Sequence, residues 1–140
     1  MTELAHELSF DTEYAYPTQD VGILVPVRLS LGDQFIDFDA RLDTGASFCI
    51  FNRAYGEALG VDVEAGEPVL VGTATGAFDA RGHTLTLTTL GHSFDAVVYF
   101  ALDPAFKRNV LGRRGWLDRV RLGLIDYEGK LYLSKYDSEG

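Results

Sequence analysis

The sequence predicts an all-β domain with one or two short helices, and two observations point to it. Valine, isoleucine, threonine, tyrosine and phenylalanine occur in short runs bounded by glycine and aspartate, as expected of strands joined by turns. The chain has 140 residues, of which 46% are hydrophobic, so it is long enough to bury the core of one domain. Because no internal repeat, low-complexity tract or linker divides it, we expect a single domain over residues 1–140.

The first predicted hairpin consists of residues 21–31 and 34–42, joined at Gly32 and Asp33. Pro26 marks an edge position or a bulge in its first strand, because proline has no backbone N–H to donate within a sheet. The N-terminal arm before it, residues 1–20, matches no pattern. A propeptide, a strand of a dimer sheet and a disordered arm all remain open for it.

A short helix is predicted over residues 53–59. Asn52 precedes this segment and can cap its N-terminus, and Gly60 follows it and can supply a left-handed stop. Gly56 lies inside the segment and weakens it as an isolated helix.

Three more hairpins follow along the chain. One spans residues 68–90 with a glycine-punctuated turn inside it, and the next pairs residues 84–90 with 94–100 across Gly91 and His92. The alternation in this region predicts a core face and a wetter face, made respectively of Leu85, Leu87 and Thr89 and of Thr84, Thr86 and Thr88. The final hairpin joins residues 121–126 to 130–134 through Tyr127, Glu128 and Gly129.

The most informative segment is Asp43-Thr44-Gly45, which follows directly on the strand over residues 34–42. These residue types suit two turns that meet: aspartate supplies an acid or base, threonine a hydroxyl, and glycine a backbone without a side chain to crowd the partner. The chain holds one copy of the segment. Half of a two-carboxylate site therefore predicts a symmetric dimer whose axis passes between the two Asp43 side chains.

At these residues the chain resembles the retropepsin-like aspartic proteases, the family of retroviral proteases and their cellular and bacterial relatives. Residues 109–113, Asn-Val-Leu-Gly-Arg, are similar to the family's paired-hydrophobic-plus-glycine element, and residues 114–120 follow as a short helix would. Residues 69–78 form a glycine-punctuated hairpin similar to the family's flap. The resemblance covers residues 22–134.

The resemblance implies a closed, barrel-like retropepsin fold with half a site per chain, active as a homodimer. It implies an aspartic endopeptidase that cuts protein or peptide substrates with Asp43, Thr44 and Gly45 as catalytic residues, without metal or cofactor. Two close carboxylates share one proton, so one can activate water while the other donates to the scissile carbonyl. Thr44 would brace the two turns across the axis, and the terminal hairpin and N-terminal arm would form the interface.

Substrate contacts are expected from the catalytic turn and from the flap. On the flap side they are Gly72, Thr73, Ala74, Thr75 and Gly76, whose glycines permit hinge motion and whose backbone groups can bind an extended peptide. On the turn side they are Arg41 and Ala46. Phe78 is expected to pack on the substrate or on the domain.

Three positions depart from the family's patterns. Ala46 lacks the hydroxyl that commonly follows the glycine in pepsin-like enzymes, and losing that donor predicts a less acidic pH optimum. Arg41, which alternation places with Asp39 on the face of Asp43, stands where an apolar residue is usual. It is either a cation beside a subsite that favours acidic substrate residues or a partner of a surface carboxylate. Arg113 resembles an arginine whose acidic partner is here replaced by Ser47, so that ion pair cannot form.

The charge and the apolar runs argue against nucleic-acid and membrane partners. A net charge of −9 repels a phosphate backbone, and the basic cluster is interpreted as a solvated helix with flanking loops; it consists of Lys107, Arg108, Arg113, Arg114, Arg119 and Arg121. Apolar stretches such as residues 97–102 are far shorter than the ~20 residues that cross a bilayer. The first residues lack the basic start and apolar run of a secretory leader, so we expect a cytoplasmic protein.

The cysteine and the histidines are interpreted as structural. Cys49 lies between Phe48 and Ile50 and is expected to be a small buried hydrophobe. His6, His83 and His92 follow no metal-ligand spacing.

Two alternatives remain open. A catalytically silent module could keep the fold and serve binding or dimerisation. An unrelated small β-barrel that binds a ligand would make Asp43-Thr44-Gly45 an ordinary turn and would predict a stable monomer. The substrate, the cleavage specificity and the affinity of the dimer have no signal in the sequence.

Overall fold

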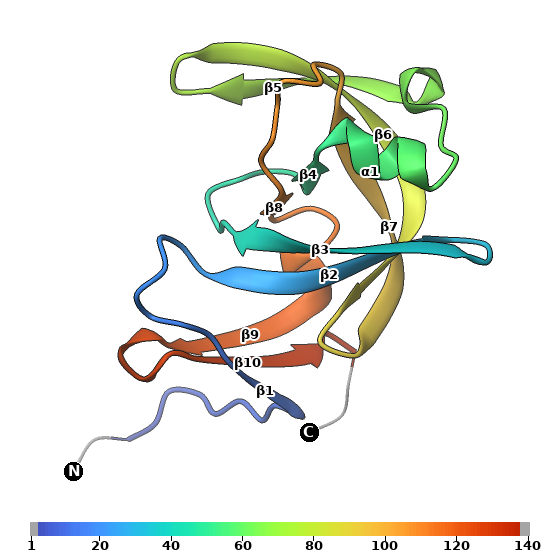
Figure 1. Cartoon of the computed structure of the whole chain (residues 1–140). Coiled ribbons are helices and arrows are strands. Elements are labelled where there is room, and N and C mark those ends of the chain that lie inside the picture. Colours follow the sequence, from blue (N-terminus) through green and yellow to red (C-terminus); the bar gives the residue numbers. More distant parts are fainter. Residues whose placement is uncertain (1–2, 138–140) are drawn as a thin grey trace.

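The computed structural model describes residues 3–137, which fold into two β-sheets (Figure 1). The larger sheet has seven strands in the order β2-β3-β8-β4-β7-β6-β5, and β2 also pairs with β6, so that part of this sheet closes on itself as a ring. The smaller sheet has three strands in the order β1-β10-β9. The predicted all-β fold is confirmed.

The strands are β1 (Thr12–Ala15), β2 (Leu24–Leu31), β3 (Gln34–Leu42), β4 (Ile50–Phe51), β5 (Glu67–Thr73), β6 (Gly76–Thr89), β7 (His92–Ala101), β8 (Val110–Leu111), β9 (Val120–Ile125) and β10 (Lys130–Lys135). The helical segments are α1 (Arg53–Ala58) and the 3₁₀ helices η1 (Val63–Ala65), η2 (Leu117–Arg119) and η3 (Asp126–Glu128).

The first hairpin, β2–β3, is the predicted one, with Leu31 opposite Gln34 across Gly32. Strand β2 begins at Leu24 and not at residue 21, since Gly22 has a φ of +85° that interrupts extended backbone. Pro26 lies just outside the segment of β2 that pairs with β6. Its missing N–H therefore costs no bond on that side, in agreement with the predicted edge position.

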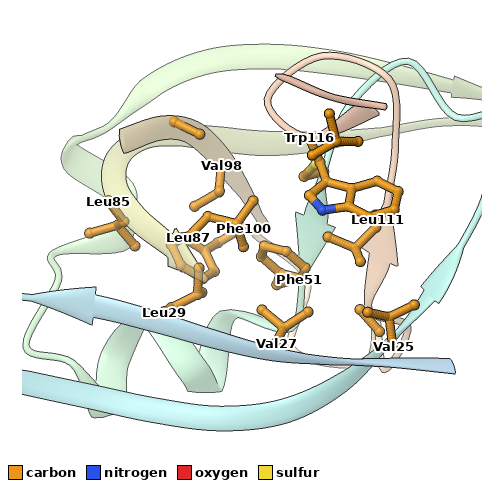
Figure 2. Close-up of a cluster of buried hydrophobic side chains, with 14 of the residues drawn as sticks. Val25, Val27, Leu29, Phe51, Leu85, Leu87, Val98, Phe100, Leu111 and Trp116 are labelled. Carbon is orange, nitrogen blue, oxygen red and sulfur yellow. The ribbon is translucent and has the colours of Figure 1, made fainter. Parts of the chain in front are cut away.

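Strand β6 is the longest and pairs with both β5 and β7, as the two predicted hairpins require. Its alternation is also as predicted, because Leu85, Leu87 and Thr89 are buried while Thr84 is exposed. Inside the ring, side chains from β2, β4, β6, β7 and β8 meet in one apolar core, which Trp116 joins from the segment after β8 (Figure 2).

Helix α1 has the predicted cap and stop. The side chain of Asn52 accepts a hydrogen bond from the N–H of Ala54 at 3.0 Å, and Gly60 has a φ of +82°. The glycine inside the helix has a packing reason, because a Cβ at Gly56 would lie 3.1 Å from the ring of Phe100.

The helix predicted over residues 114–120 is wrong in length. The segment forms only the 3₁₀ helix η2, and β9 begins at Val120. Gly115 has a φ of +98°, which no α-helix accommodates, and its N–H donates to the Asp118 carboxylate at 3.0 Å. Trp116 still anchors this segment as expected: it is 1% exposed, and its indole donates to the Thr89 hydroxyl at 3.0 Å.

The smaller sheet contains the predicted terminal hairpin, β9–β10, which turns at Gly129 with a φ of +67°. Part of the N-terminal arm completes this sheet, since Thr12 pairs with Leu133 and Ala15 with Lys130. Residues 12–15 are thus a strand on the protein's own sheet. No helix within residues 3–137 has the length and apolar character needed to span a membrane.

Candidate active site

Asp43 lies where β3 stops, and the strand β8 determines its surroundings. Strand β8 lies between β3 and β4, parallel to the first and antiparallel to the second. The chain therefore leaves β3, turns over residues 43–49 and returns as β4 on the other side of β8 (Figure 1). The N–H of Asp43 donates to the Leu111 carbonyl at 3.0 Å, which fixes the start of the turn on β8.

Within the turn, the Asp43 carboxylate is oriented by the backbone. The Gly45 N–H donates to Asp43 Oδ1 at 2.9 Å, and the Ala46 N–H donates to the Asp43 carbonyl at 3.2 Å. A Cβ at Gly45 would lie 3.3 Å from that same Oδ1, so a side chain there would crowd the carboxylate. Asp43, Thr44 and Gly45 are all exposed in the single chain. The turn thus presents an oriented carboxylate on an open face.

Gly112 explains why a glycine belongs in the motif over residues 109–113. A Cβ at this position would clash with the Phe48 carbonyl oxygen and would lie 2.8 Å from the Ala46 carbonyl oxygen. Beside it, the N–H of Arg113 donates to the Ala46 carbonyl at 2.9 Å and the N–H of Arg114 to the Ser47 carbonyl at 3.0 Å. The turn and the segment after β8 are therefore joined backbone to backbone.

Cys49 supports the turn from inside the core, as its expected structural role requires. Its side chain is fully buried, and its sulfur accepts from the Gly112 N–H at 3.4 Å. Burial raises the pKa of the Cys49 thiol to about 12, so the group stays protonated and unreactive near neutral pH.

A pocket of about 330 Å³ opens beside the Asp43 carboxylate. Its lining combines two carboxylates with three cations, namely Asp39 and Asp43 with Arg41, Lys107 and Arg108. The predicted common face of Asp39, Arg41 and Asp43 is thereby brought together. The sequence reasoning missed Lys107 and Arg108, although both directly precede the motif that begins at Asn109.

Comparisons with known proteins agree with this geometry. A family model described as aspartyl protease matches residues 25–114, which include the turn, the pocket and β8. This chain belongs to the aspartyl protease family. No protein with a curated description matches it.

Among solved structures, 114 chains match, one of them the crystal structure of a retropepsin-like aspartic protease from Rickettsia conorii. That match has a TM-score of 0.63 and 20% sequence identity, and it covers 88% of this chain and 98% of the other. The fold of this aspartyl protease family member is thus retropepsin-like, as expected.

The predicted flap is an exposed hairpin tip in this member of the aspartyl protease family. Thr73 pairs with Gly76, and the Thr73 hydroxyl donates to the Gly76 carbonyl at 3.0 Å. The tip projects to the same side of the molecule as the turn over residues 43–49 (Figure 1). In the described single chain, residues 72–76 do not line the pocket beside Asp43. Phe78 packs on Phe106 with ring centroids 4.8 Å apart, so it contacts the domain.

The departure at Ser47 is seen directly. Ser47 and Arg113 line a second pocket, of about 480 Å³, on the other side of the turn. Within the described part of the chain, Arg113 has no carboxylate within ion-pair distance. Arg119, another member of the basic cluster, instead stacks on the ring of Phe94 at 4.7 Å.

Two histidines have structural partners. His83 Nε2 lies 2.9 Å from the Val63 carbonyl oxygen, and His92 Nε2 lies 3.0 Å from an Asp11 carboxylate oxygen. Over residues 3–137, no group of three or more His, Cys, Asp or Glu side chains is placed to hold a metal ion.

Proposed function

We propose that this protein is an aspartic endopeptidase whose active site consists of the Asp43 carboxylates of two copies of the chain. The observation that carries the proposal is the exposed Asp43 carboxylate, held by the Gly45 N–H at 2.9 Å at the end of β3. One carboxylate cannot serve as acid and base in the same step, and a second copy about a two-fold axis supplies the other. Membership of the aspartyl protease family supports the same assignment.

The two carboxylates share one proton, because two adjacent negative charges are costly. The ionised Asp43 takes a proton from a water molecule while the protonated Asp43 donates its proton to the oxygen of the scissile carbonyl. Water oxygen then bonds to the carbonyl carbon and forms a neutral tetrahedral diol. Collapse of the diol breaks the C–N bond, and the nitrogen leaves with a proton returned by the dyad. No covalent enzyme intermediate is needed.

The remaining residues of the turn and the hairpin position the reactants. The exposed Thr44 hydroxyl is available to brace the two turns across the axis, and the exposed backbone of residues 72–76 is available to bind an extended peptide. Ala46 provides no hydroxyl to the carboxylate, so we expect a pH optimum less acidic than that of pepsin-like enzymes. A pH-rate profile that peaks well below about pH 4 would contradict this expectation.

The test compares wild type with Asp43→Asn on a denatured protein mixture between about pH 3.5 and 7.5, with new termini read by mass spectrometry. Asp33→Asn is the matched control, because it removes an exposed carboxylate from the β2–β3 turn. We expect wild type and Asp33→Asn to cut and Asp43→Asn to be inactive. Cleavage by Asp43→Asn at the wild-type rate would refute the proposal.

The dimer is tested by dilution and by salt. At −9 per chain the two copies repel one another, so we expect specific activity to fall on dilution and to recover with added salt. A folded dimer that cuts nothing would favour a non-cutting module of the same fold. A folded monomer at all concentrations would refute the shared site.

A further inference from the structure

We propose that this active site selects a substrate with an acidic side chain next to the scissile bond, and that Lys107 and Arg108 bind it together with Arg41. The inference rests on the proposed function, because it assigns a substrate class to the same site. Its basis is the pocket beside Asp43, in which three cations face two carboxylates.

The charge of this pocket is opposite to that of the molecule. The chain carries −9 overall, yet Arg41, Lys107 and Arg108 outnumber Asp39 and Asp43 in the pocket. In a dyad that shares one proton the imbalance is greater, since the two Asp43 side chains then carry a single negative charge. Throughout residues 3–137, none of the three cations lies within ion-pair distance of a carboxylate. Their charge is therefore available to a ligand.

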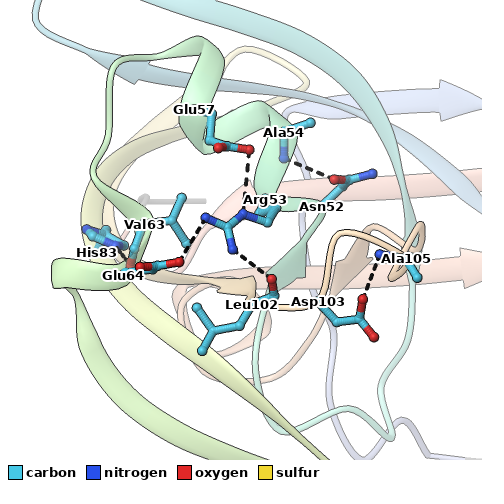
Figure 3. Close-up of polar contacts among 10 residues, drawn as sticks. All are labelled: Asn52, Arg53, Ala54, Glu57, Val63, Glu64, His83, Leu102, Asp103 and Ala105. Atoms are coloured by element: carbon cyan, nitrogen blue, oxygen red, sulfur yellow. Dashed lines mark hydrogen bonds and ion pairs between the residues drawn. The ribbon is translucent and has the colours of Figure 1, made fainter.

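The loop that carries Lys107 and Arg108, residues 102–109, is fixed at both ends by the start of helix α1. At one end, the Arg53 guanidinium donates to the Leu102 carbonyl at 2.7 Å and is itself held by Glu57 and Glu64, at 3.5 and 3.6 Å (Figure 3). At the other end, the Asn109 side chain accepts from the Asn52 N–H at 3.1 Å.

The interior of the loop is also ordered. The Asp103 carboxylate accepts from the Ala105 N–H at 2.9 Å, and the Asp103 carbonyl accepts from the Phe106 N–H at 3.0 Å. Phe106 then packs on Phe78 of β6, which joins the loop to the hairpin that carries the predicted flap. The two cations after Phe106 are thus exposed side chains on a fixed backbone, which lowers the entropy that a ligand must overcome.

Arg41 is held at the edge of the same pocket. Its side chain runs past Gly22, where a Cβ would lie 2.8 Å from Arg41 Nε, and its guanidinium reaches the Val21 carbonyl at 3.4 Å. This placement favours one of the two interpretations of Arg41, because its neighbour is a carbonyl group and not a surface carboxylate. Its remaining N–H donors can bind a carboxylate of the substrate.

The size of the effect follows from exposed ion pairs, each of which changes affinity by about two- to five-fold. Two or three such contacts predict that a Glu peptide is cut about tenfold more efficiently than its Gln counterpart. The Gln side chain matches Glu in shape, so this ratio isolates the charge. The preference should decrease with salt and disappear below about pH 4, where Glu becomes protonated.

The test uses pairs of end-blocked peptides built on a sequence that the wild-type enzyme cuts, with Glu or Gln placed in turn at each position around the bond. We expect a kcat/KM ratio of about ten for at least one position next to the bond. The double variant Lys107→Gln/Arg108→Gln should lower that ratio to about two, and Lys135→Gln should leave it unchanged. Lys135 is on β10 and removes the same charge outside the pocket.

The outcomes separate this inference from the proposed function. If wild type cuts both peptides of every pair at equal rates, the acidic preference is refuted and the protease assignment stands. If the ratio is high but the double variant keeps it, the cations that bind the substrate are not Lys107 and Arg108. If wild type cuts no peptide and no protein, the proposed function fails and this inference fails with it.

Discussion

The carbonyl oxygen of Phe48 occupies the space that a Cβ of residue 112 would need. The turn that carries Asp43 and the segment after β8 can therefore approach only if residue 112 is glycine. Hydrogen bonds from the Arg113 and Arg114 N–H groups to this turn depend on the same approach. One position without a side chain thus controls the placement of a carboxylate that is far away in sequence.

Gly112→Ala should destabilise the protein by about 1–3 kcal/mol and abolish activity, because the backbone of Phe48 must move to admit the new Cβ. Urea unfolding and a peptide cleavage assay measure the two effects. Gly72→Ala is the stability control, since nothing lies within 4 Å of a Cβ there. Equal stability of the two variants would show that the turn tolerates the displacement.

Thr89→Val should cost about 1–3 kcal/mol in the free energy of unfolding, because it leaves the buried Trp116 N–H without its acceptor. Urea titration followed by tryptophan fluorescence measures this, as Trp116 is the single tryptophan of the chain. Thr89→Ser keeps the hydroxyl and should retain most of that stability. If Thr89→Ser is as unstable as Thr89→Val, the lost methyl group and not the hydrogen bond is the cause.

Cys49 should resist alkylation in the folded protein and react when the protein unfolds. A pKa of about 12 leaves far less thiolate at about pH 8 than an unfolded chain holds, by roughly a thousandfold, and burial also blocks access. Iodoacetamide labelling with and without urea, read by intact mass, measures this directly at the single cysteine. Labelling of the native protein as fast as in urea would contradict the buried position.

Tyr16 should make stability depend on alkaline pH. Its hydroxyl donates to the Asp126 carboxylate at 2.6 Å, and burial together with this contact raises the pKa of Tyr16 to about 12. Because the folded pKa exceeds the ordinary value of 10.0, the contribution is complete below about pH 10 and is lost as the pH rises to about 12.

The measurement is the difference in unfolding free energy between wild type and Tyr16→Phe, which lacks the titrating hydroxyl, over about pH 8–12. This difference should be constant at the lower end and should shrink at the upper end. Tyr127→Phe is the control, since Tyr127 is 99% exposed. A difference that does not vary with pH would contradict the raised pKa.

Local patterns carried most of what the sequence predicted correctly. Alternation in β6, the Asn52 cap and the Gly60 stop act over a few residues, so the sequence shows them directly. The helix after residue 113 was predicted too long because the positive φ of Gly115 depends on packing that the pattern does not contain. The pairing of β1 with β10 was missed as a definite feature, since it joins residues more than a hundred positions apart.

The candidate site divides in the same way. Asp43-Thr44-Gly45 was visible as a motif, but Lys107 and Arg108 look like any charged loop in the sequence. They enter the site only because β8 pairs with β3 and brings the end of their loop beside Arg41. A site that depends on long-range strand pairing cannot be completed from local residue patterns.

The position of β8 also orders events during synthesis. Asp43 leaves the ribosome well before Leu111 and Arg114, whose backbone completes its turn, because a chain emerges from its N-terminus. Until those later residues have emerged, the aspartate belongs to an unclosed loop with no fixed orientation. The growing polypeptide therefore acquires an ordered Asp43 carboxylate only after most of its own length has been made.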